Sequence, residues 1–250
     1  MITRENAFFL GARRTAQEYF FKTLFSNAKA MMNDGRVELV AIREHIAPGS
    51  VVLDVGAHVG VFSRRFAALA PDCTIVAFEP QSLPRSVFNM AGFFRKPNNI
   101  LVLPLALGAE AGLMNLTIPI KQSGAVGIGL AHMGKDDDLA DRFEIKKELV
   151  AVARLDDVLT RLDLGPVSLI KIDVEGGELN VLRGAQQTLE RYSPALLCEI
   201  DGREQRFNQT AGDLSTFLAE RGYVPFSLET GAALSTDTLE KNTLFLKQER

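Results

Sequence analysis

The chain has 250 residues, 46% of them hydrophobic and 24% charged, which is the balance of one globular α/β domain with additions and is enough to bury a sizeable core. Its formal charge of −3 argues against a nucleic-acid-binding protein, which usually carries a basic excess. No run reaches the roughly 18 apolar residues of a transmembrane helix, and the first residues lack the apolar core of a signal peptide, so we expect a cytoplasmic protein without a transmembrane segment.

The N-terminal part of the chain is expected to be helical. Apolar residues recur at helical spacing over residues 6–32 without a proline, and a second helix is predicted over 36–46. We assign residues 1–49 to an N-terminal helical extension and residues 50–250 to a single domain. The apolar stripe of the extension favours packing on the core or on a second copy, so a homodimer through these helices and a lid over the pocket are both left open.

From Ser50 onward, short apolar runs alternate with helical patterns. This alternation is typical of parallel βαβ units, and right-handed crossovers then produce a doubly wound sheet. Cys73 and Cys198 lie in strand-like runs and form no metal-ligand spacing, so we expect core thiols in a reducing compartment. The expected strands of the first half are 51–55, 74–78 and 100–107, and the expected helices are about 60–70 and 82–94.

The segment at about 108–150 interrupts this alternation and is expected to be a β insertion. It contains two strand-like runs, 113–120 and 148–155, separated by a glycine-rich and then acidic stretch. The βα alternation then resumes and the chain closes with an antiparallel pair of strands. The expected elements are strands 168–173 and 195–200, one helix with Leu179, Leu182, Leu189 and Tyr192 on its apolar side, a helix over 211–221, and strands near 224–228 and 243–247.

A glycine turn follows the first expected strand, where a doubly wound fold binds ligands. It reads Asp54-Val55-Gly56-Ala57-His58-Val59-Gly60. We expect Gly56 to let the backbone approach a ligand and Gly60 to allow close packing of the helix on the strand. His58 stands where dinucleotide-binding loops have glycine, which weakens an NAD interpretation, and histidine tolerates the left-handed angles that such a turn needs.

Acidic residues end the next strands of the predicted sheet. Glu79 follows Asp54 by 25 residues, and a carboxylate there can accept hydrogen bonds from both ribose hydroxyls of an adenosine. Asp173 ends the strand of Lys171-Ile172-Asp173-Val174-Glu175-Gly176-Gly177-Glu178, and Glu199 and Asp201 end the strand beside it. Paired acids at this edge suit three roles, which are binding acceptor hydroxyls, holding a divalent cation such as Mg²⁺, or acting as general base.

Four segments together resemble the FkbM-type methyltransferase family, whose members typically read DVGANxG, FEP, LDDL and KIDVEGxE…LxGA. The resemblance runs from about Ser50 to Asp201, and this chain has His58 where the family usually has asparagine. The matching segments are Val51–Gly60, Ala77–Pro80, Ala153–Val158 and Leu169–Ala185.

The resemblance implies a Rossmann-like, doubly wound, mostly parallel seven-stranded methyltransferase sheet and S-adenosylmethionine as cofactor. It implies O-methylation of a small-molecule or glycan acceptor such as a sugar, a glycolipid or a natural product. Asp173 and Glu175 are placed toward the transferred methyl group and the acceptor, and Glu199 joins them as a candidate catalytic residue. The implied cofactor-binding residues are Asp54, Gly56, Ala57, His58 and Gly60 near the methionine part, Glu79 with Pro80 near the ribose, and Ala106, within 105–107, near the adenine.

Two other functions remain open at this point. A nucleotide-dependent oxidoreductase would use the same fold, but the chain lacks GxGxxG. A non-catalytic binding protein could also keep the fold, but it would have no physical need for Asp54, Glu79 and Asp173. An alcohol acceptor requires a base or a metal ion, and besides the acids the candidates for that base are His58, His132 and His45.

Overall fold

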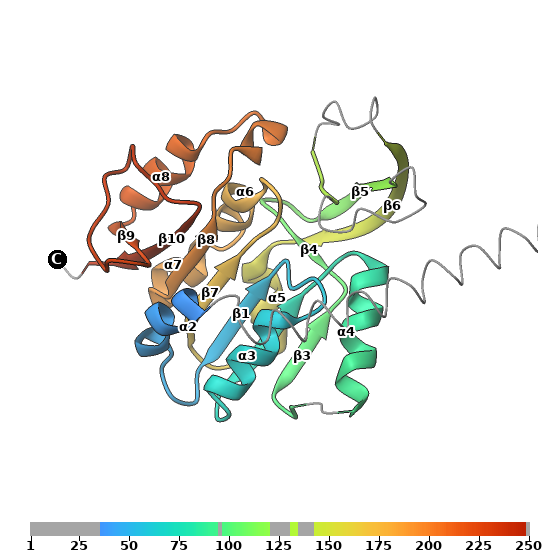
Figure 1. Ribbon diagram of the computed structural model, residues 1–250, viewed down its shortest axis with the longest axis horizontal. Helices are drawn as coiled ribbons and strands as arrows, with labels where there is room; N and C mark the ends of the chain where they lie inside the picture. The colour runs from blue at the N-terminus through green and yellow to red at the C-terminus, as the bar shows by residue number, and fades with distance from the viewer. Residues whose placement is uncertain (1–35, 95–96, 121–130, 135–142, 249–250) are drawn as a thin grey trace, which may run out of the picture.

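The computed structural model describes residues 36–94, 97–120, 131–134 and 143–248. Figure 1 shows a central sheet with helices on both faces and a smaller sheet beside it. The helix predicted over 6–32 lies outside the described residues, so the dimer and lid interpretations, and the division at residue 49, stay predictions. Among the described residues, no helix is long and apolar enough to cross a membrane.

The central sheet has seven strands in the order β3-β2-β1-β7-β8-β10-β9. Strand β10 runs antiparallel to both of its neighbours, and the remaining neighbouring pairs are parallel. The chain winds outward from β1 to β3 and then returns to the other side at β7, so β1 and β7 flank the switch point where such folds bind ligands. The doubly wound, mostly parallel sheet is therefore confirmed. Its strands are β1 Val51–Val55, β2 Thr74–Phe78, β3 Ile100–Leu103, β7 Val167–Ile172, β8 Ala195–Glu199, β9 Tyr223–Ser227 and β10 Asn242–Lys247.

Alternating residues of each central strand feed two separate hydrophobic clusters. On β1, Leu53 faces the cluster with α5 to α8, whereas Val52 faces the cluster with α2, α3 and α4. Because both faces are covered, the strands are apolar almost throughout. The helices are α2 Arg36–Ile42, α3 Val61–Leu69 and α4 Ser82–Phe94 on one face, and α5 Leu155–Leu162, α6 Glu178–Arg183, α7 Gln186–Tyr192 and α8 Ala211–Ala219 on the other; short 3-10 turns, η1 Arg43–His45 and η4 Arg203–Phe207, follow α2 and β8.

The strand expected over 100–107 is divided between two sheets. Strand β3 ends at Leu103, and β4 (Ala106–Leu107) pairs with β6 of the smaller sheet. The physical reason is Pro104, which has no N–H for the ladder and therefore ends the strand. The prediction of one strand was wrong, and the break carries residues 105–107 across the end of β2.

The helix expected after Asp173 is also divided, into α6 and α7. The break lies at Gly184, where an added Cβ would stand 2.1 Å from the carbonyl oxygen of Gly108. The strand expected over 148–155 instead spans Glu144–Ala153, and Leu155 begins α5. These boundaries differ because contacts between segments far apart in the chain decide them.

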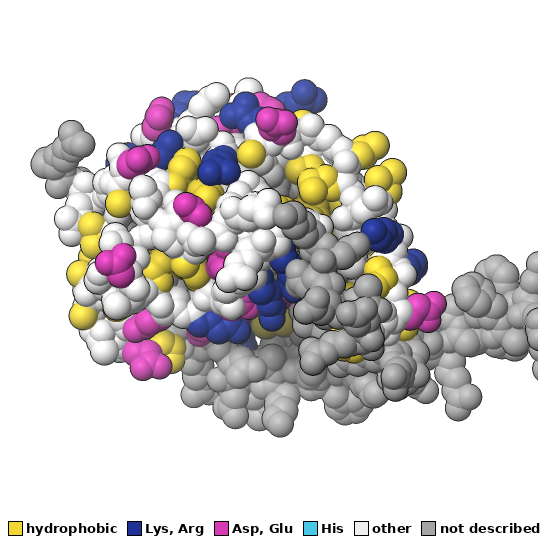
Figure 2. All heavy atoms as spheres, turned by 90° about the horizontal axis from the view of Figure 1, so that it is seen from above, with side chains coloured by type: hydrophobic (Ala, Val, Ile, Leu, Met, Phe, Trp, Pro, Cys, Tyr) yellow, Lys and Arg dark blue, Asp and Glu magenta, His cyan; other side chains and the backbone are white. Residues whose placement is uncertain are grey.

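The smaller sheet contains β4, β6 (Glu144–Ala153) and β5 (Gly112–Ile120), in that order. Its inner face is buried, with Leu116 and Val150 in a third hydrophobic cluster. Its outer face carries exposed leucines, Leu113 and Leu149, which are 68% and 64% exposed. Figure 2 shows hydrophobic side chains at the surface on the side where β5 and β6 lie. The insertion predicted at about 108–150 is thus a β arm beside the central sheet.

Asp156, in the segment that matches LDDL, anchors the start of α7. Its carboxylate accepts hydrogen bonds from the backbone N–H groups of Gln187 (3.1 Å) and Thr188 (3.0 Å) and from the Thr188 hydroxyl (2.7 Å). The side chain is buried, and Arg154 lies 3.6 Å away. A carboxylate at a helix N-terminus satisfies otherwise unpaired N–H groups and interacts favourably with the helix dipole.

We expect Asp156→Ala to lower the free energy of unfolding by about 2–3 kcal/mol, because it leaves buried N–H groups unpaired. The matched control is Asp157→Ala. The Asp157 side chain is 52% exposed, and its single ion pair, with Arg154, is long at 4.0 Å. An exposed pair of this kind should change stability by no more than about 0.5 kcal/mol. Urea unfolding at constant m-value measures both variants, and equal losses would contradict the anchoring role.

Candidate functional site

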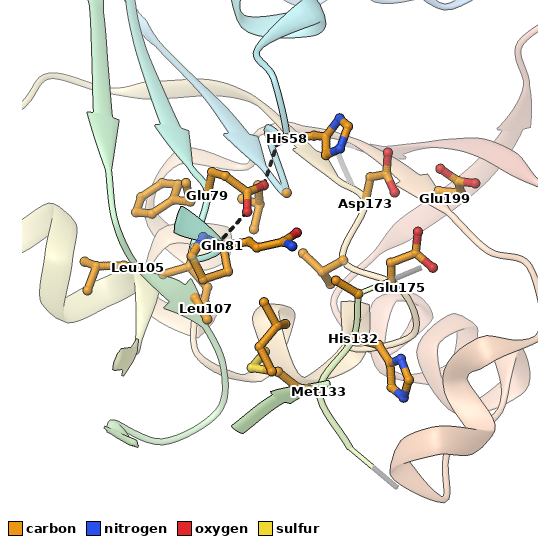
Figure 3. Close-up of a pocket in the computed structure, with 18 residues that line it drawn as sticks. His58, Glu79, Gln81, Leu105, Leu107, His132, Met133, Asp173, Glu175 and Glu199 are labelled. Carbon is orange, nitrogen blue, oxygen red and sulfur yellow. Dashed lines mark hydrogen bonds between the residues drawn. The ribbon is translucent and has the colours of Figure 1, made fainter. Parts of the chain in front are cut away.

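A cavity of about 260 Å³ opens at the carboxyl ends of β1, β2, β7 and β8 and is covered on one side by the smaller sheet. In Figure 3, Glu79 and Gln81 lie on one side of it and Asp173, Glu175 and Glu199 on another. Its lining residues are Val55, Gly56, His58, Phe78, Glu79, Pro80, Gln81, Leu105, Ala106, Leu107, Leu116, Ala131, His132, Met133, Asp173, Val174, Glu175 and Glu199.

The turn after β1 requires glycine at position 56. Gly56 has a φ of +81°, and its N–H donates to the Phe78 carbonyl. A Cβ at this position would lie 1.8 Å from the main-chain oxygen of Asp173. Glycine is therefore required here because two loops of the protein approach each other closely. The expectation from the sequence was a close approach to a ligand instead. The contact between the loops brings the glycine turn and the Asp173 loop to the same wall of the cavity.

His58 adopts the left-handed conformation that the sequence predicted, with a φ of +51°. Its backbone N–H donates to Glu79 Oε2 at 2.7 Å, which joins the glycine turn to the end of β2. Burial lowers the pKa of the imidazole below its ordinary value, and the nearby Asp173 carboxylate opposes this effect. Within the described part of the chain, Nε2 has no hydrogen-bond partner.

Glu79 is held by two backbone amides at the cavity wall. The Gln81 N–H donates to Oε1 at 2.8 Å, opposite the bond from His58 to Oε2, and Figure 3 shows both bonds. Burial raises the pKa of this carboxyl to about 7, although both amides act to lower it. Each carboxylate oxygen has a second lone pair, so the group can still accept two hydroxyl donors.

Two acids in contact with each other, each paired with a lysine, lie along the other wall. Lys171 Nζ lies 2.9 Å from Asp173 Oδ2, Asp173 is hydrogen-bonded to Glu199, and Lys241 Nζ lies 2.7 Å from Glu199 Oε1. Burial favours a raised pKa for Asp173, but the Lys171 ammonium and the hydrogen bond with Glu199 together outweigh it, and the pKa is lowered. Burial and the Asp173 charge raise the pKa of Glu199. Asp173 is therefore the acid of this pair that loses its proton first as the pH rises.

Glu175 lines the cavity but is committed to ion pairs. It has a φ of +63°, and its carboxylate contacts Arg203 and Arg206 of η4. The Arg206 guanidinium also donates to the Glu175 carbonyl at 3.2 Å. Because of this pairing, Glu175 is better suited to shaping the cavity mouth than to removing a proton. Its role is therefore expected to differ from those of Asp173 and Glu199.

Three of the expected cofactor-contacting residues do not line the cavity. Asp54 is fully buried on the α3 face, where it accepts a hydrogen bond from Ser63. Ala57 is also buried, and Gly60 packs where an added Cβ would lie 2.3 Å from the Phe88 ring of α4. Gly60 thus serves contact between α3 and α4, not the expected contact between helix and strand.

Several lining residues carry no motif that sequence reasoning could use. Gln81 directly follows the FEP segment, and this neighbouring position is the one feature of the sequence that could have placed it in the cavity. Leu116 and Met133 reach the cavity only because the β arm folds over it. His132, one of the candidate bases, is buried in the lining and pairs its backbone with Thr117, whereas His45 lies in η1 and does not line the cavity.

The described residues contain no cluster of three or more His, Cys, Asp or Glu side chains arranged for a metal ion. The Lys171 ammonium, 2.9 Å from Asp173, already neutralises the acid that a cation would contact. The residues present therefore do not fit the divalent cation that the paired acids left open. Cys73 and Cys198 are both buried and unpaired, as expected for core thiols.

Residues 54–225 match the family model described as the methyltransferase FkbM domain. This match covers more than half of the chain and includes the glycine turn, Glu79, Asp173 and Glu199. The chain belongs to the FkbM methyltransferase family. The resemblance that rested on four short segments is confirmed over the main part of the central sheet.

Curated proteins with similar sequences include one that is itself named FkbM. The 31-O-demethyl-FK506 methyltransferase FkbM of Streptomyces tacrolimicus is 32% identical over 161 residues, 56% of this chain and 61% of that protein. The 2-O-methyltransferase NoeI of Sinorhizobium fredii is 26% identical over 152 residues, 58% of this chain and 60% of that protein. The AMB antimetabolite synthetase AmbE of Pseudomonas aeruginosa is 27% identical over 242 residues, 85% of this chain but 11% of that protein. This chain thus spans less than two thirds of the length of each of these relatives.

Among solved structures, methyltransferase FkbM from Methylobacillus flagellatus KT superposes with a TM-score of 0.51. The two share 15% sequence identity, and the superposition covers 95% of this chain and 58% of that one. At this identity the likeness shows a shared fold, in agreement with the seven-stranded sheet.

Proposed function

We propose that this FkbM-family protein is an S-adenosylmethionine-dependent O-methyltransferase that acts on a hydroxyl of a sugar, a glycolipid or a natural product. The observation that carries the proposal is that the glycine turn at Gly56, Glu79 and Asp173 line one cavity at the switch point of the sheet. The family match supports methyl transfer over hydride transfer, so the oxidoreductase alternative is set aside.

The lining residues fit the three parts of this cofactor. The buried carboxylate of Glu79 keeps acceptor capacity for the two ribose hydroxyls. Leu105, Ala106 and Leu107 provide an apolar wall suited to the adenine. Gly56 and His58 border the region assigned to the methionine arm, where the buried Nε2 of His58 is available to a polar group.

The bound cofactor would supply a methyl group activated by its sulfonium. The protein must place an acceptor hydroxyl in line with that group, and such orientation supplies much of the acceleration in reactions of this type. Asp173 would hold the acceptor hydroxyl and take its proton, so that the oxygen could accept the methyl group that the cofactor supplies when it is bound. Asp173, whose pKa is lowered while that of Glu199 is raised, carries the negative charge that can accept that proton.

The names of two relatives favour oxygen as the acceptor atom. One is called a 31-O-demethyl-FK506 methyltransferase and the other a 2-O-methyltransferase. On this chain, the acceptor would meet the wall with Asp173, Val174 and Glu199, together with Met133 from the β arm. We therefore propose that the β arm determines acceptor specificity.

Calorimetry with S-adenosylmethionine or its demethylated product tests the proposed cofactor, and absence of binding at millimolar concentration would contradict it. A screen of host glycans and metabolites for label from methyl-labelled cofactor then identifies the acceptor. Cofactor binding without transfer to any hydroxyl compound would support the non-catalytic alternative instead.

Cofactor affinity is expected to depend on pH through Glu79. The ionised carboxylate accepts the ribose hydroxyls, and burial raises its pKa to about 7 in the free protein. Below pH 7 the group must lose a proton to bind, so affinity should fall by about tenfold per pH unit, whereas above pH 7 it should be constant. Calorimetry at pH 6 in buffers of different ionisation enthalpy should show proton release on binding.

Glu79→Ala is expected to weaken cofactor binding by about 1–3 kcal/mol at pH 8 and to abolish the pH dependence. The control is Glu148→Ala, because Glu148 also contacts the segment after Pro80, through Ser82, but lies outside the cavity lining. A Glu79→Ala variant with unchanged affinity would exclude the ribose role.

A further inference from the structure

Lys171 is a buried cation at the centre of the sheet. Its side chain is 8% exposed, and it lies on β7 on the face covered by α3. Burial of an unpaired ammonium is unfavourable, so a lysine here needs compensating charges. Nζ lies 2.9 Å from Asp173 Oδ2 and 3.9 Å from Asp54 Oδ1, and 4.8 Å from the ring centre of Phe62.

The three contacts of Lys171 hold its ammonium in one place. Asp54 is itself fixed by the Ser63 hydroxyl from the first turn of α3, and Phe62 belongs to the same turn. Asp54, Ser63 and Phe62 therefore contact or support the ammonium from β1 and α3. On its other side the ammonium contacts Asp173, which lines the cavity. The ammonium is therefore a fixed charge behind the acid that faces the cavity.

Two acids stand at that wall, and they are not equivalent. Asp173 is in direct contact with Lys171, whereas Glu199 is held by Lys241, whose side chain is 63% exposed. Both acids are partly exposed, Asp173 by 31% and Glu199 by 24%, so the difference lies in the two lysines. The charge of Lys241 is close to solvent and is screened, whereas that of the buried Lys171 is screened much less. The buried lysine thus selects which acid carries the charge.

We propose that Lys171 is a positioning residue that holds Asp173 as an oriented carboxylate at the acceptor wall, so that Asp173 and not Glu199 receives the acceptor proton. This inference rests on the proposed methyl transfer for its catalytic consequence, but its electrostatic part concerns the protein alone. Other groups also face Asp173: His58 from the turn after β1, Glu199 from β8, Asp54 from β1, and Glu38 of α2 across a small cavity of about 70 Å³.

The test is a carboxyl ¹³C NMR titration of Asp173 in the cofactor-free full chain, assigned by comparison with Asp173→Asn. In Lys171→Met the titration midpoint of Asp173 is expected to rise by about 1–3 pH units, because an adjacent opposite charge is removed. Lys171→Arg keeps the charge and should leave the midpoint close to that of the natural protein. The matched control, Lys241→Met, removes a lysine from the other acid and should hardly move the Asp173 midpoint.

If Lys171→Met fails to fold, the double variant Asp54→Asn with Lys171→Met removes both buried groups, and a smaller rise is expected because the negative charge of Asp54 is lost as well. An Asp173 midpoint that stays unchanged in the folded variant would overturn the proposal. In methyl transfer, the acid limb of kcat/KM should move up in pH by the same amount while cofactor affinity is kept. Because the titration needs no cofactor, absence of methyl transfer would count against the proposed function and leave this result intact.

Discussion

Replacing Gly56 with alanine is expected to lower the free energy of unfolding by about 2–5 kcal/mol and to abolish cofactor binding. The left-handed conformation at a φ of +81° costs about 1–2 kcal/mol for a residue with a Cβ. The added Cβ would also lie 1.8 Å from the Asp173 carbonyl oxygen. The backbone shift that accommodates such an added atom typically costs about 1–3 kcal/mol more. The loop that carries Asp173 must therefore move away from the turn.

The matched control for this substitution is Gly222→Ala. Gly222 has nearly the same φ, +80°, but nothing lies within 4 Å of the position of its added Cβ. It should lose only the conformational part, about 1–2 kcal/mol. Urea unfolding gives both stabilities, and calorimetry at a temperature where both variants are folded gives cofactor binding. Equal losses in the two variants would mean that the contact between the turn and the Asp173 loop is unimportant.

Sequence reasoning located the strand-end residues because their signals are local. A strand followed by glycine, or by an acid, places that residue at the carboxyl edge of a parallel sheet whatever the rest of the chain does. Gly56, Glu79 and Asp173 were predicted in this way, and the structure brings all three to one cavity. The doubly wound, mostly parallel sheet followed from the βα alternation and from the handedness of the crossovers.

The remaining features depend on contacts between distant segments. The split at Gly184 arises because the end of α6 meets the carbonyl of Gly108, 76 residues earlier in the chain. Pro104 was visible in the sequence, but the transfer of Ala106 to a second sheet depends on pairing with Val152. Asp54 lies outside the cavity lining for a similar reason, since its carboxylate contacts Ser63 and Lys171 on the α3 face.

Asp173→Asn is expected to lower the rate of methyl transfer by about 10²–10⁴-fold, the usual contribution of a general base. The amide has the shape of the carboxylate but cannot accept the acceptor proton at neutral pH. The backbone N–H of Asp173 donates to the Val55 carbonyl at 3.0 Å, a bond that the substitution preserves, and the amide oxygen can still accept a hydrogen bond from Lys171, so the loop should keep its place. Cofactor affinity is therefore expected to change little, and kcat should carry the loss.

The companion variants separate the acids of the cavity. Glu175→Gln should reduce kcat much less than Asp173→Asn, because Glu175 is already paired with Arg203 and Arg206. Asp201→Asn, which loses only its contact with Arg203 outside the cavity lining, serves as the control for removal of a nearby charge. If Asp173→Asn kept its rate within tenfold while Glu199→Gln abolished transfer, the base would be Glu199. In that case the buried Lys171 would serve to stabilise the sheet, because the acid that it keeps ionised would not be the one that takes the proton.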